Sequence, residues 1–229
     1  MRVLAAAVAA LAVIILVVMS QARPLPDRPL PTAHGEGPVA LPSPAPAGAI
    51  SLEEALARRR SVRAFTPRAL STNEVGQLLW AAQGVTDSRG HRTAPSAGAT
   101  YPLEVYAVTP EGVWRYLPAG HALAIVRTGD VRPDLAAAAL GQGAVASAPL
   151  VVVINGVVTR TAARYGSRAE RYVWLEAGHA AQNVLLEAVA LDLGAVPIGA
   201  FDDDAVRAVV GASAGEDALY LVPVGHPAQ

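Results

Sequence analysis

The sequence predicts an α+β fold, a sandwich in which helices flank a mixed sheet. Two observations lead to this prediction. Helical and strand patterns are interleaved along residues 50–229, and a hairpin comes early in this stretch whereas isolated strands come late. This stretch is also long enough to bury a single hydrophobic core, so we expect one domain over residues 50–229.

The bulk composition excludes several classes of site. The chain has 229 residues, a net charge of −1 and a pI near 6.5, so nothing in its overall charge favours a nucleic-acid partner. It contains no cysteine, which excludes disulfides, thiolate metal sites and cysteine nucleophiles. Its five histidines are scattered and lack the spacing of metal-binding motifs, so we expect no metal site.

An uncharged apolar run of 17 residues, Val3 to Met19, follows Arg2. Its length lies between the ~7–15 apolar residues of a signal peptide and the ~17–25 of a spanning helix. Ser20 and Ala22 are small residues that suit cleavage after Ala22. We therefore expect residues 1–22 to be a cleaved signal peptide or a membrane anchor, with residues 3–19 as the tether. The chain would then be exported or membrane-anchored, and the side of the membrane stays open.

Residues 23–49 are rich in proline, with alanine, glycine and serine between the prolines. Such a composition buries too little apolar surface to fold alone. This segment is predicted to be an extended, semi-rigid linker.

Two capping patterns open the domain. Ser51 to Glu54 reads as a capping box and predicts a short helix to about Arg60. Ser71 to Glu74 repeats the pattern, and the apolar stripe that follows predicts a second helix. Next come two apolar runs, Val105 to Thr109 and Val113 to Leu117, around a short glycine-containing turn, which predict a β-hairpin.

The second half of the domain alternates helices with strands. An alanine-rich helix is expected from Pro133 to about Val145, and Leu150 to Asn155 reads as a strand that is buried on both faces. Arg168 to Leu193 is the longest predicted helix, with small residues on its inner face and Gly194 as its C-terminal cap. A short segment, a helix capped by Asp202 and a final strand complete the domain; the segment is Val196–Phe201 and the strand Leu219–Val224.

A cluster of arginines is the first candidate for chemistry. Arg59, Arg60, Ser61 and Arg63 lie where the first helix of the domain ends. Guanidinium groups offer planar pairs of donors that suit phosphate, and the serine adds a hydroxyl. A solvated basic helix end is the alternative, because cations are favoured at helix C-termini.

Two loops of small residues are the second candidate. The first loop contains Pro95, Ser96 and Ala97, and the second contains Pro197, Ile198 and Gly199. In both, the backbone can approach a flat ligand because large side chains are missing. The alternatives are a plain connection for the first loop and a helix cap with a turn for the second.

Taken in order, these segments resemble three motifs of the nitroreductase-like flavoproteins. The matching segments are Arg59-Arg60-Ser61-x-Arg63-x-Phe65, then Pro95 to Pro102, then Val196 to Phe201, and the resemblance extends from Ser51 to the end. Glu176 to Asn183, with Tyr165 to Arg168 before it, resembles one branch more closely. That branch holds the SagB-type dehydrogenases that form thiazoles and oxazoles from azolines.

The resemblance implies a nitroreductase-like homodimer with FMN at the subunit interface. By matching position, the arginine cluster would hold the FMN phosphate, ribityl chain and ring edge. Pro95, Ser96 and Ala97 would reach the flavin from the other subunit. The ring would be lined by Pro197, Ile198 and Gly199, and Gln142 would lie nearby.

The implied function is that of an FMN-dependent oxidoreductase. It would move hydride through flavin N5 to or from a small organic or peptide substrate, with NAD(P)H as a candidate electron donor. Azoline-oxidising relatives carry a Lys-Tyr pair where this chain has Arg164-Tyr165. Arginine cannot act as a base, so Tyr165 is the remaining catalytic candidate of the pair. The alternative is an exported or anchored module that binds flavin or a partner without turnover.

Overall fold

The computed structural model describes residue 30 and residues 37–228. The predicted signal peptide or anchor, residues 1–22, lies outside the described residues. Among the described residues, no helix combines the length and the apolar character needed to span a membrane.

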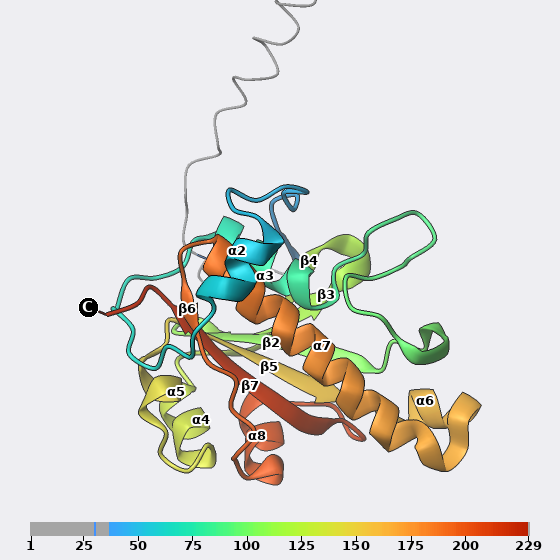
Figure 1. Cartoon of the computed structure of the whole chain (residues 1–229). Helices are drawn as coiled ribbons and strands as arrows, with labels where there is room; N and C mark the ends of the chain where they lie inside the picture. Colours follow the sequence, from blue (N-terminus) through green and yellow to red (C-terminus); the bar gives the residue numbers. More distant parts are fainter. Residues whose placement is uncertain (1–29, 31–36, 229) are drawn as a thin grey trace, which may run out of the picture.

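Seven strands form one sheet at the centre of the domain (Figure 1). Neighbouring strands are antiparallel throughout, and the one parallel pairing described is a single bridge between Ser61 and Ala195. The predicted α+β class is confirmed. The sheet was predicted to be mixed, but its strands are antiparallel and the Ser61–Ala195 bridge is the one parallel contact described. Across the sheet the strands are β1 (Val39–Ala40), β4 (Ala122–Thr128), β3 (Gly112–Leu117), β2 (Leu103–Thr109), β5 (Leu150–Gly156), β7 (Asp217–Gly225) and β6 (Gly194–Ala195).

Helices cover both faces of the sheet (Figure 1). The residues of α3 and α7 belong to one core cluster, and those of α4, α5 and α8 belong to the other. The helices are α2 (Leu52–Arg58), α3 (Thr72–Gln83), α4 (Arg132–Ala138), α5 (Gly143–Ser147), α6 (Val158–Tyr165), α7 (Ala169–Ala190) and α8 (Asp203–Val210).

The central strand β5 shows how the sequence divides the core. Leu150, Val152 and Ile154 pack into the cluster with α3 and α7, whereas Val151 and Val153 pack into the other cluster. Successive side chains of a strand point to opposite faces, so an unbroken apolar run serves both layers. The prediction of a strand buried on both faces is confirmed.

The predicted capping residues start their helices as expected. The Ser71 hydroxyl accepts the backbone N–H of Glu74, and the Glu74 carboxylate accepts the backbone N–H of Ser71 at 2.7 Å. Ser51 and Asp202 cap α2 and α8 in the same way through one side-chain hydrogen bond each. These short signals set the starts of three helices.

The predicted helix over residues 133–145 is wrong in one respect, because it is broken into α4 and α5. Leu140 and Gly141 both have positive φ, at 58° and 75°, and the Gly141 N–H donates back to the Ala136 carbonyl. A glycine in the left-handed region is a common helix terminator. Helix α6 and the strands β1, β4 and β6 were not predicted.

Part of the predicted linker belongs to the domain. Val39 and Ala40 pair with β4, the Leu41 side chain is buried, and the Ala45 N–H donates to the side chain of Gln77. The described part of residues 23–49 therefore packs on the sheet edge instead of forming a free spacer. The domain therefore begins before the predicted boundary at residue 50. Composition does not reveal this, because the segment is held by backbone hydrogen bonds to the distant strand β4.

His121 fastens this segment. Its Nε2 donates to the Pro42 carbonyl at 2.9 Å, so in the neutral ring Nδ1 accepts from the Tyr116 hydroxyl at 2.8 Å. Burial lowers the pKa of His121, and the hydrogen bond to Pro42 opposes the shift only in part. The neutral ring is therefore the form that the fold stabilises.

We expect this contact to weaken in acid. A lowered pKa in the folded state gives stability that is present above the ordinary histidine value of about 6.5 and is lost as the pH falls below it. Replacing His121 with asparagine, which tolerates the left-handed backbone found here (φ 42°), should cost about 1 kcal/mol at neutral pH. Urea denaturation at pH 7.5 and at pH 5 should show a smaller cost in acid. An equal cost at both pH values would contradict this.

Candidate functional site

Two of the arginines at the end of α2 are occupied by protein partners. The Arg58 guanidinium bonds the carboxylates of Glu54 and Asp192, each at 3.1 Å. Arg60 folds back, and its Nη1 donates to the carbonyls of Ala57 and Arg59 at 3.0 and 2.7 Å. These contacts fix the end of α2 beside the end of α7.

The other two arginines keep their donors free. The side chains of Arg59 and Arg63 form no hydrogen bond or ion pair with the described part of the chain. Ser61 lies between them and is exposed. The arginine cluster thus presents two unneutralised guanidinium groups and a hydroxyl, a donor set that suits a phosphate.

The arginine cluster is joined directly to the third motif. Ser61 forms a parallel bridge with Ala195, and the Val62 N–H donates to the Ala195 carbonyl at 3.0 Å. Gly194 allows this approach, because a Cβ at that position would lie 2.6 Å from the Val62 side chain. Two segments that are distant in sequence therefore meet at one edge of the sheet.

From this junction the third motif runs back along β7. Ile198 exchanges two backbone hydrogen bonds with Leu221, at 2.8 and 3.0 Å. Gln142 holds the next turn, since its side-chain nitrogen donates to the carbonyls of Ala200 and Ala139 at 2.8 and 3.0 Å. The structure thus brings Gln142, Pro197, Ile198 and Gly199 together.

A cavity of about 650 Å³ opens beside Gly199. This volume lies within the ~300–1,000 Å³ of typical ligand sites. Three residues lie between Ala195 and Gly199, so four steps of about 3.3 Å place Gly199 at most about 13 Å along the motif from the junction with the arginine cluster. Aromatic and apolar groups from α7, β7 and the third motif line it together with three carboxylates: Trp174, Ala177, Gly199, Phe201, Ala218, Leu219, Tyr220, Glu170, Asp203 and Asp217.

The second motif is fastened to α7 by Glu176. The Ala97 N–H donates to this buried carboxylate at 2.8 Å, and the Tyr101 N–H donates to the Ser96 hydroxyl at 2.9 Å. Burial raises the pKa of Glu176, and the hydrogen bond from Ala97 acts against that shift. Pro95 begins the loop and is exposed.

Tyr165 lies against the same loop. Gly98 has a φ of 61°, which favours glycine, and a Cβ there would come within 2.8 Å of the Tyr165 hydroxyl. The Tyr165 ring meets Tyr172 edge to face at 5.1 Å, and Arg164 donates to the Gly98 carbonyl. The structure therefore brings Tyr165 to the second motif.

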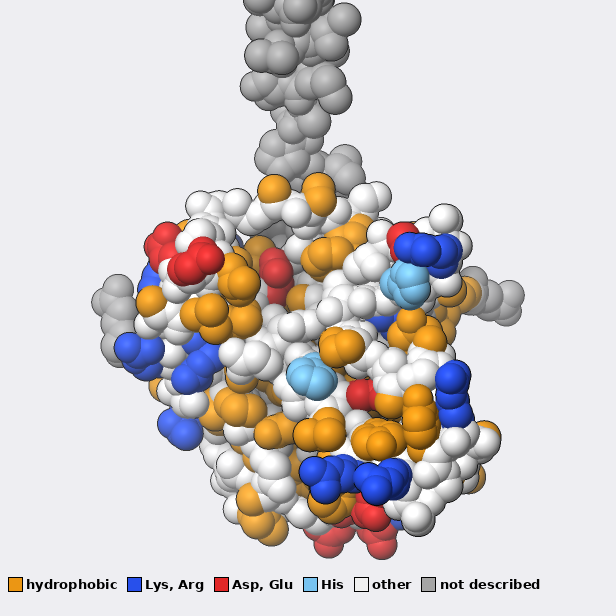
Figure 2. Space-filling view, turned by 45° about the vertical axis from the view of Figure 1, so that its right-hand side comes forward, with side chains coloured by type: hydrophobic (Ala, Val, Ile, Leu, Met, Phe, Trp, Pro, Cys, Tyr) orange, Lys and Arg blue, Asp and Glu red, His pale blue; other side chains and the backbone are white. Residues whose placement is uncertain are grey.

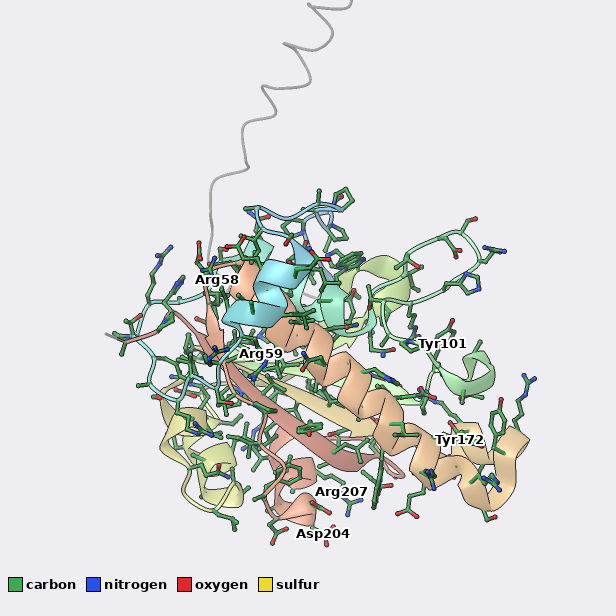
Figure 3. All side chains as sticks on the ribbon, in the orientation of Figure 1. Arg58, Arg59, Tyr101, Tyr172, Asp204 and Arg207 are labelled. Atoms are coloured by element: carbon green, nitrogen blue, oxygen red, sulfur yellow. The ribbon has the colours of Figure 1, made fainter. Side chains whose placement is uncertain are left out.

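Within one chain the second motif is remote from the arginine cluster. The cluster lies at the C-terminal end of α7, whereas Glu176 lies 14 residues before Ala190, which is about 21 Å along the helix. Figure 3 shows Arg59 and Tyr101 on opposite sides of α7. The sequence-predicted residues thus form two groups.

Glu176 was given no role from the sequence. The available signal was its place among the small residues on the inner face of the long helix, since a carboxylate is seldom buried without a partner. Its partner, the backbone of Ala97, lies 79 residues away, which local patterns do not reveal.

Comparison with known proteins identifies the fold and the family. A model of the nitroreductase family matches residues 56–226. The chain belongs to the nitroreductase family. This is a family of oxidoreductases whose members generally bind FMN and are generally dimers.

Individual relatives agree with this assignment. A protein of Methanocaldococcus jannaschii, named as a nitroreductase, is 45% identical over 183 residues, covering 77% of this chain and 91% of its own. The trifolitoxin operon protein TfxC of Rhizobium leguminosarum is 29% identical over 206 residues, covering 80% of this chain and 57% of its own.

Solved structures match as well. A crystal structure named as a nitroreductase of Ralstonia eutropha superposes with a TM-score of 0.77 at 31% identity, covering 90% of this chain and 97% of that one. The NADPH:FMN oxidoreductase of Vibrio harveyi, in complex with NAD+, has a TM-score of 0.59 at 22% identity, covering 78% and 69%. At that identity the likeness concerns the fold.

Proposed function

We propose that this nitroreductase-family protein binds FMN and transfers hydride through flavin N5 to or from a small organic or peptide substrate. One observation carries the proposal. The third motif connects two guanidinium groups that have no partner in the described part of the chain with an aromatic-lined cavity of about 650 Å³. FMN has the matching form, with a phosphate at one end and a flat ring at the other.

The arginine cluster would hold the phosphate end. Arg59 and Arg63 would do most of this work, because one nitrogen of Arg60 is already engaged by backbone carbonyls. Ser61 adds a hydroxyl donor beside them. A doubly charged phosphate gains charge-assisted hydrogen bonds from such a set.

The third motif would line the ring. Pro197, Ile198 and Gly199 form an extended wall, and Gly199 carries no side chain to obstruct a flat ligand. Gln142 would orient the Ala200 carbonyl, because its side-chain nitrogen already donates to it. When bound, FMN supplies N5 as hydride donor or acceptor, and the protein supplies orientation and exclusion of water.

The flavin site would be completed by a second copy of the chain. We infer that Pro95, Ser96 and Ala97 contact the flavin of the partner copy, in keeping with a family whose members are generally dimers. Exposed apolar side chains on α2 and α7 also favour a partner, and Figure 2 shows hydrophobic groups spread over the centre of the displayed face. The exposed residues are Leu52, Leu56, Trp174 and Leu175.

The azoline-oxidising branch is the more specific assignment that we propose. The run Glu176 to Asn183, Tyr165 before it and the similarity to TfxC support it. The Tyr165 hydroxyl would hold or move the proton, since Arg164 stays protonated. The alternative is NAD(P)H as donor with nitroaromatics or quinones as acceptors, and the description of the family as nitroreductases favours a nitroaromatic acceptor.

We also propose that residues 3–19 tether the chain to a membrane or direct its export. Their uncharged apolar composition supports this. Cell fractionation with an intact-mass measurement tests it. Recovery of the full chain in the soluble cytoplasmic fraction would refute both versions.

The first experiment is an absorbance spectrum of the purified full chain, before and after NADPH without oxygen. A flavin spectrum that bleaches supports FMN redox function. A flavin that resists NAD(P)H but bleaches with a thiazoline peptide supports the dehydrogenase branch. No flavin, even after reconstitution with FMN, would overturn the proposal and favour the alternative of a binding module without turnover.

A further inference from the structure

A second, smaller cavity lies behind the second motif. Its volume is about 140 Å³, and it lies where the loop before the second motif meets β2, β3 and α6. Three arginines and a single carboxylate line it, namely Arg92, Arg115, Arg160 and Glu104. None of these residues belongs to the proposed flavin site.

The carboxylate neutralises only part of the positive charge. Arg115 bonds one oxygen of Glu104 through two nitrogens, at 2.9 and 2.7 Å, and Arg160 bonds the other oxygen. Arg160 also donates to the Tyr101 carbonyl at 3.2 Å. Two cations therefore share one anion, which leaves one positive charge in excess.

Arg92 adds a second excess charge. Its guanidinium lies 4.4 Å from the centre of the Tyr101 ring and donates to the Gln83 side chain at 2.9 Å, but it forms no ion pair with any described residue. Burial lowers the pKa of Arg92, and Arg160 acts in the same direction. An arginine nevertheless remains protonated, so a half-buried cation is left without a counter-charge.

Each guanidinium also keeps unused donors. Within the described chain, Nη2 of Arg92, Nη1 of Arg115 and Nε of Arg160 have no hydrogen-bond partner. Three arginines that line one small cavity thus carry unused donors and two positive charges in excess, which is a composition that suits an oxyanion.

We propose that this cavity binds the phosphate or carboxylate group of a small anionic ligand. Its volume of about 140 Å³ is well above the ~10–15 Å³ that a single water needs on this measure, so it leaves room for one tetrahedral or planar oxyanion. The site is separate from the arginine cluster. It lies against Tyr101, so an occupant would stiffen the loop that holds Ser96 and Ala97.

Arg92→Gln is the informative variant. Arg92 has no carboxylate partner among the described residues, so its removal breaks no ion pair, whereas removal of Arg115 or Arg160 would break one with Glu104. Arg89→Gln is the matched control, because Arg89 lies on the same loop, is exposed and pairs only with the neighbouring Asp87. Arg92→Lys keeps the charge without the planar donor pair and serves if the glutamine variant is unstable.

The test titrates the protein with sodium phosphate or sodium acetate at constant ionic strength and follows its melting temperature. Saturating FMN occupies the other phosphate site. The same titration on an Arg59→Gln/Arg63→Gln background without FMN makes the result independent of the flavin proposal. We expect one anion to stabilise the protein, with an apparent Kd about tenfold weaker in Arg92→Gln and unchanged in Arg89→Gln.

Comparing the two anions shows whether the natural ligand carries a phosphate or a carboxylate group. Stabilisation by phosphate alone indicates a phosphate-bearing ligand, and stabilisation by acetate indicates a carboxylate. Absence of stabilisation by either anion beyond that of chloride would overturn the proposal. The same conclusion follows if the Arg92→Gln and Arg92→Lys variants both bind as tightly as the unaltered protein.

Discussion

Replacing Glu216 with alanine is expected to lower the free energy of unfolding by about 3–5 kcal/mol. Glu216 is only 2% exposed, and its carboxylate accepts from Tyr106 (2.9 Å), Asn155 (3.0 Å) and the Ser213 N–H (3.2 Å). Alanine would leave these donors buried without an acceptor, at about 1–3 kcal/mol each before relaxation. The effect would be large because the carboxylate joins β2, β5 and the turn before β7.

The pKa of Tyr106 reflects the same contact. Burial raises it well above the ordinary value, and the hydrogen bond to Glu216 raises it further. The phenol therefore stays a donor at any ordinary pH. Its hydroxyl would then have no acceptor in the alanine variant, and glutamine, which retains one oxygen, should be the milder change.

Urea denaturation of the two variants measures the effect. Asp217→Ala is the control, since Asp217 is the next residue, is exposed and should change stability by less than about 0.5 kcal/mol. A loss below about 1 kcal/mol for Glu216→Ala would mean that water replaces the carboxylate. The large contribution to stability that we expect from the Glu216 hydrogen bonds would then be contradicted.

Much of the fold follows from local patterns. The capping residues Ser51, Ser71 and Asp202 set the starts of three helices, and the apolar run over β5 identified a strand buried on both faces. These signals are contained within a few neighbouring residues. The prediction of one helix over residues 133–145 was wrong, because the chain turns through the left-handed region at Gly141 although alanines on both sides favour a helix.

Elements that depend on distant partners were missed. Strand β1 exists because Val39 and Ala40 pair with β4, more than 80 residues later, and because His121 holds Pro42. The proline-rich composition predicted only a linker. Helix α6 has eight residues and only Thr161 among them is buried, so it carries no apolar stripe from which a helix could be predicted.

The candidate site divides in the same way. The arginine cluster and the two loops were found because each motif is contiguous in sequence. Glu176 and Arg92 were not assigned roles, because a backbone N–H and an aromatic ring supplied by other segments determine what they do. Sequence thus located the backbone segments of the site, and the structure added the side chains that hold them.

The change with the largest expected effect on the proposed site is the double variant Arg59→Gln/Arg63→Gln. It should weaken FMN binding about a hundredfold, because each charge-assisted hydrogen bond contributes about 1.5–3 kcal/mol and tenfold in Kd corresponds to about 1.4 kcal/mol. We take the lower end of this range because Arg63 is exposed. Fluorescence titration of the apoprotein with FMN measures the change.

Salt and a matched control decide whether the loss is electrostatic. Arg68→Gln removes an exposed charge a few residues further on and should leave the affinity for FMN unchanged. Raising the ionic strength should weaken binding to the unaltered protein more than to the double variant, because the phosphate contacts that salt screens are absent from the variant. Riboflavin, which lacks the phosphate, should bind both proteins equally. If the double variant bound FMN as tightly as the unaltered protein, the phosphate would have to lie elsewhere, and the anion cavity beside Arg92 would become the first alternative to examine.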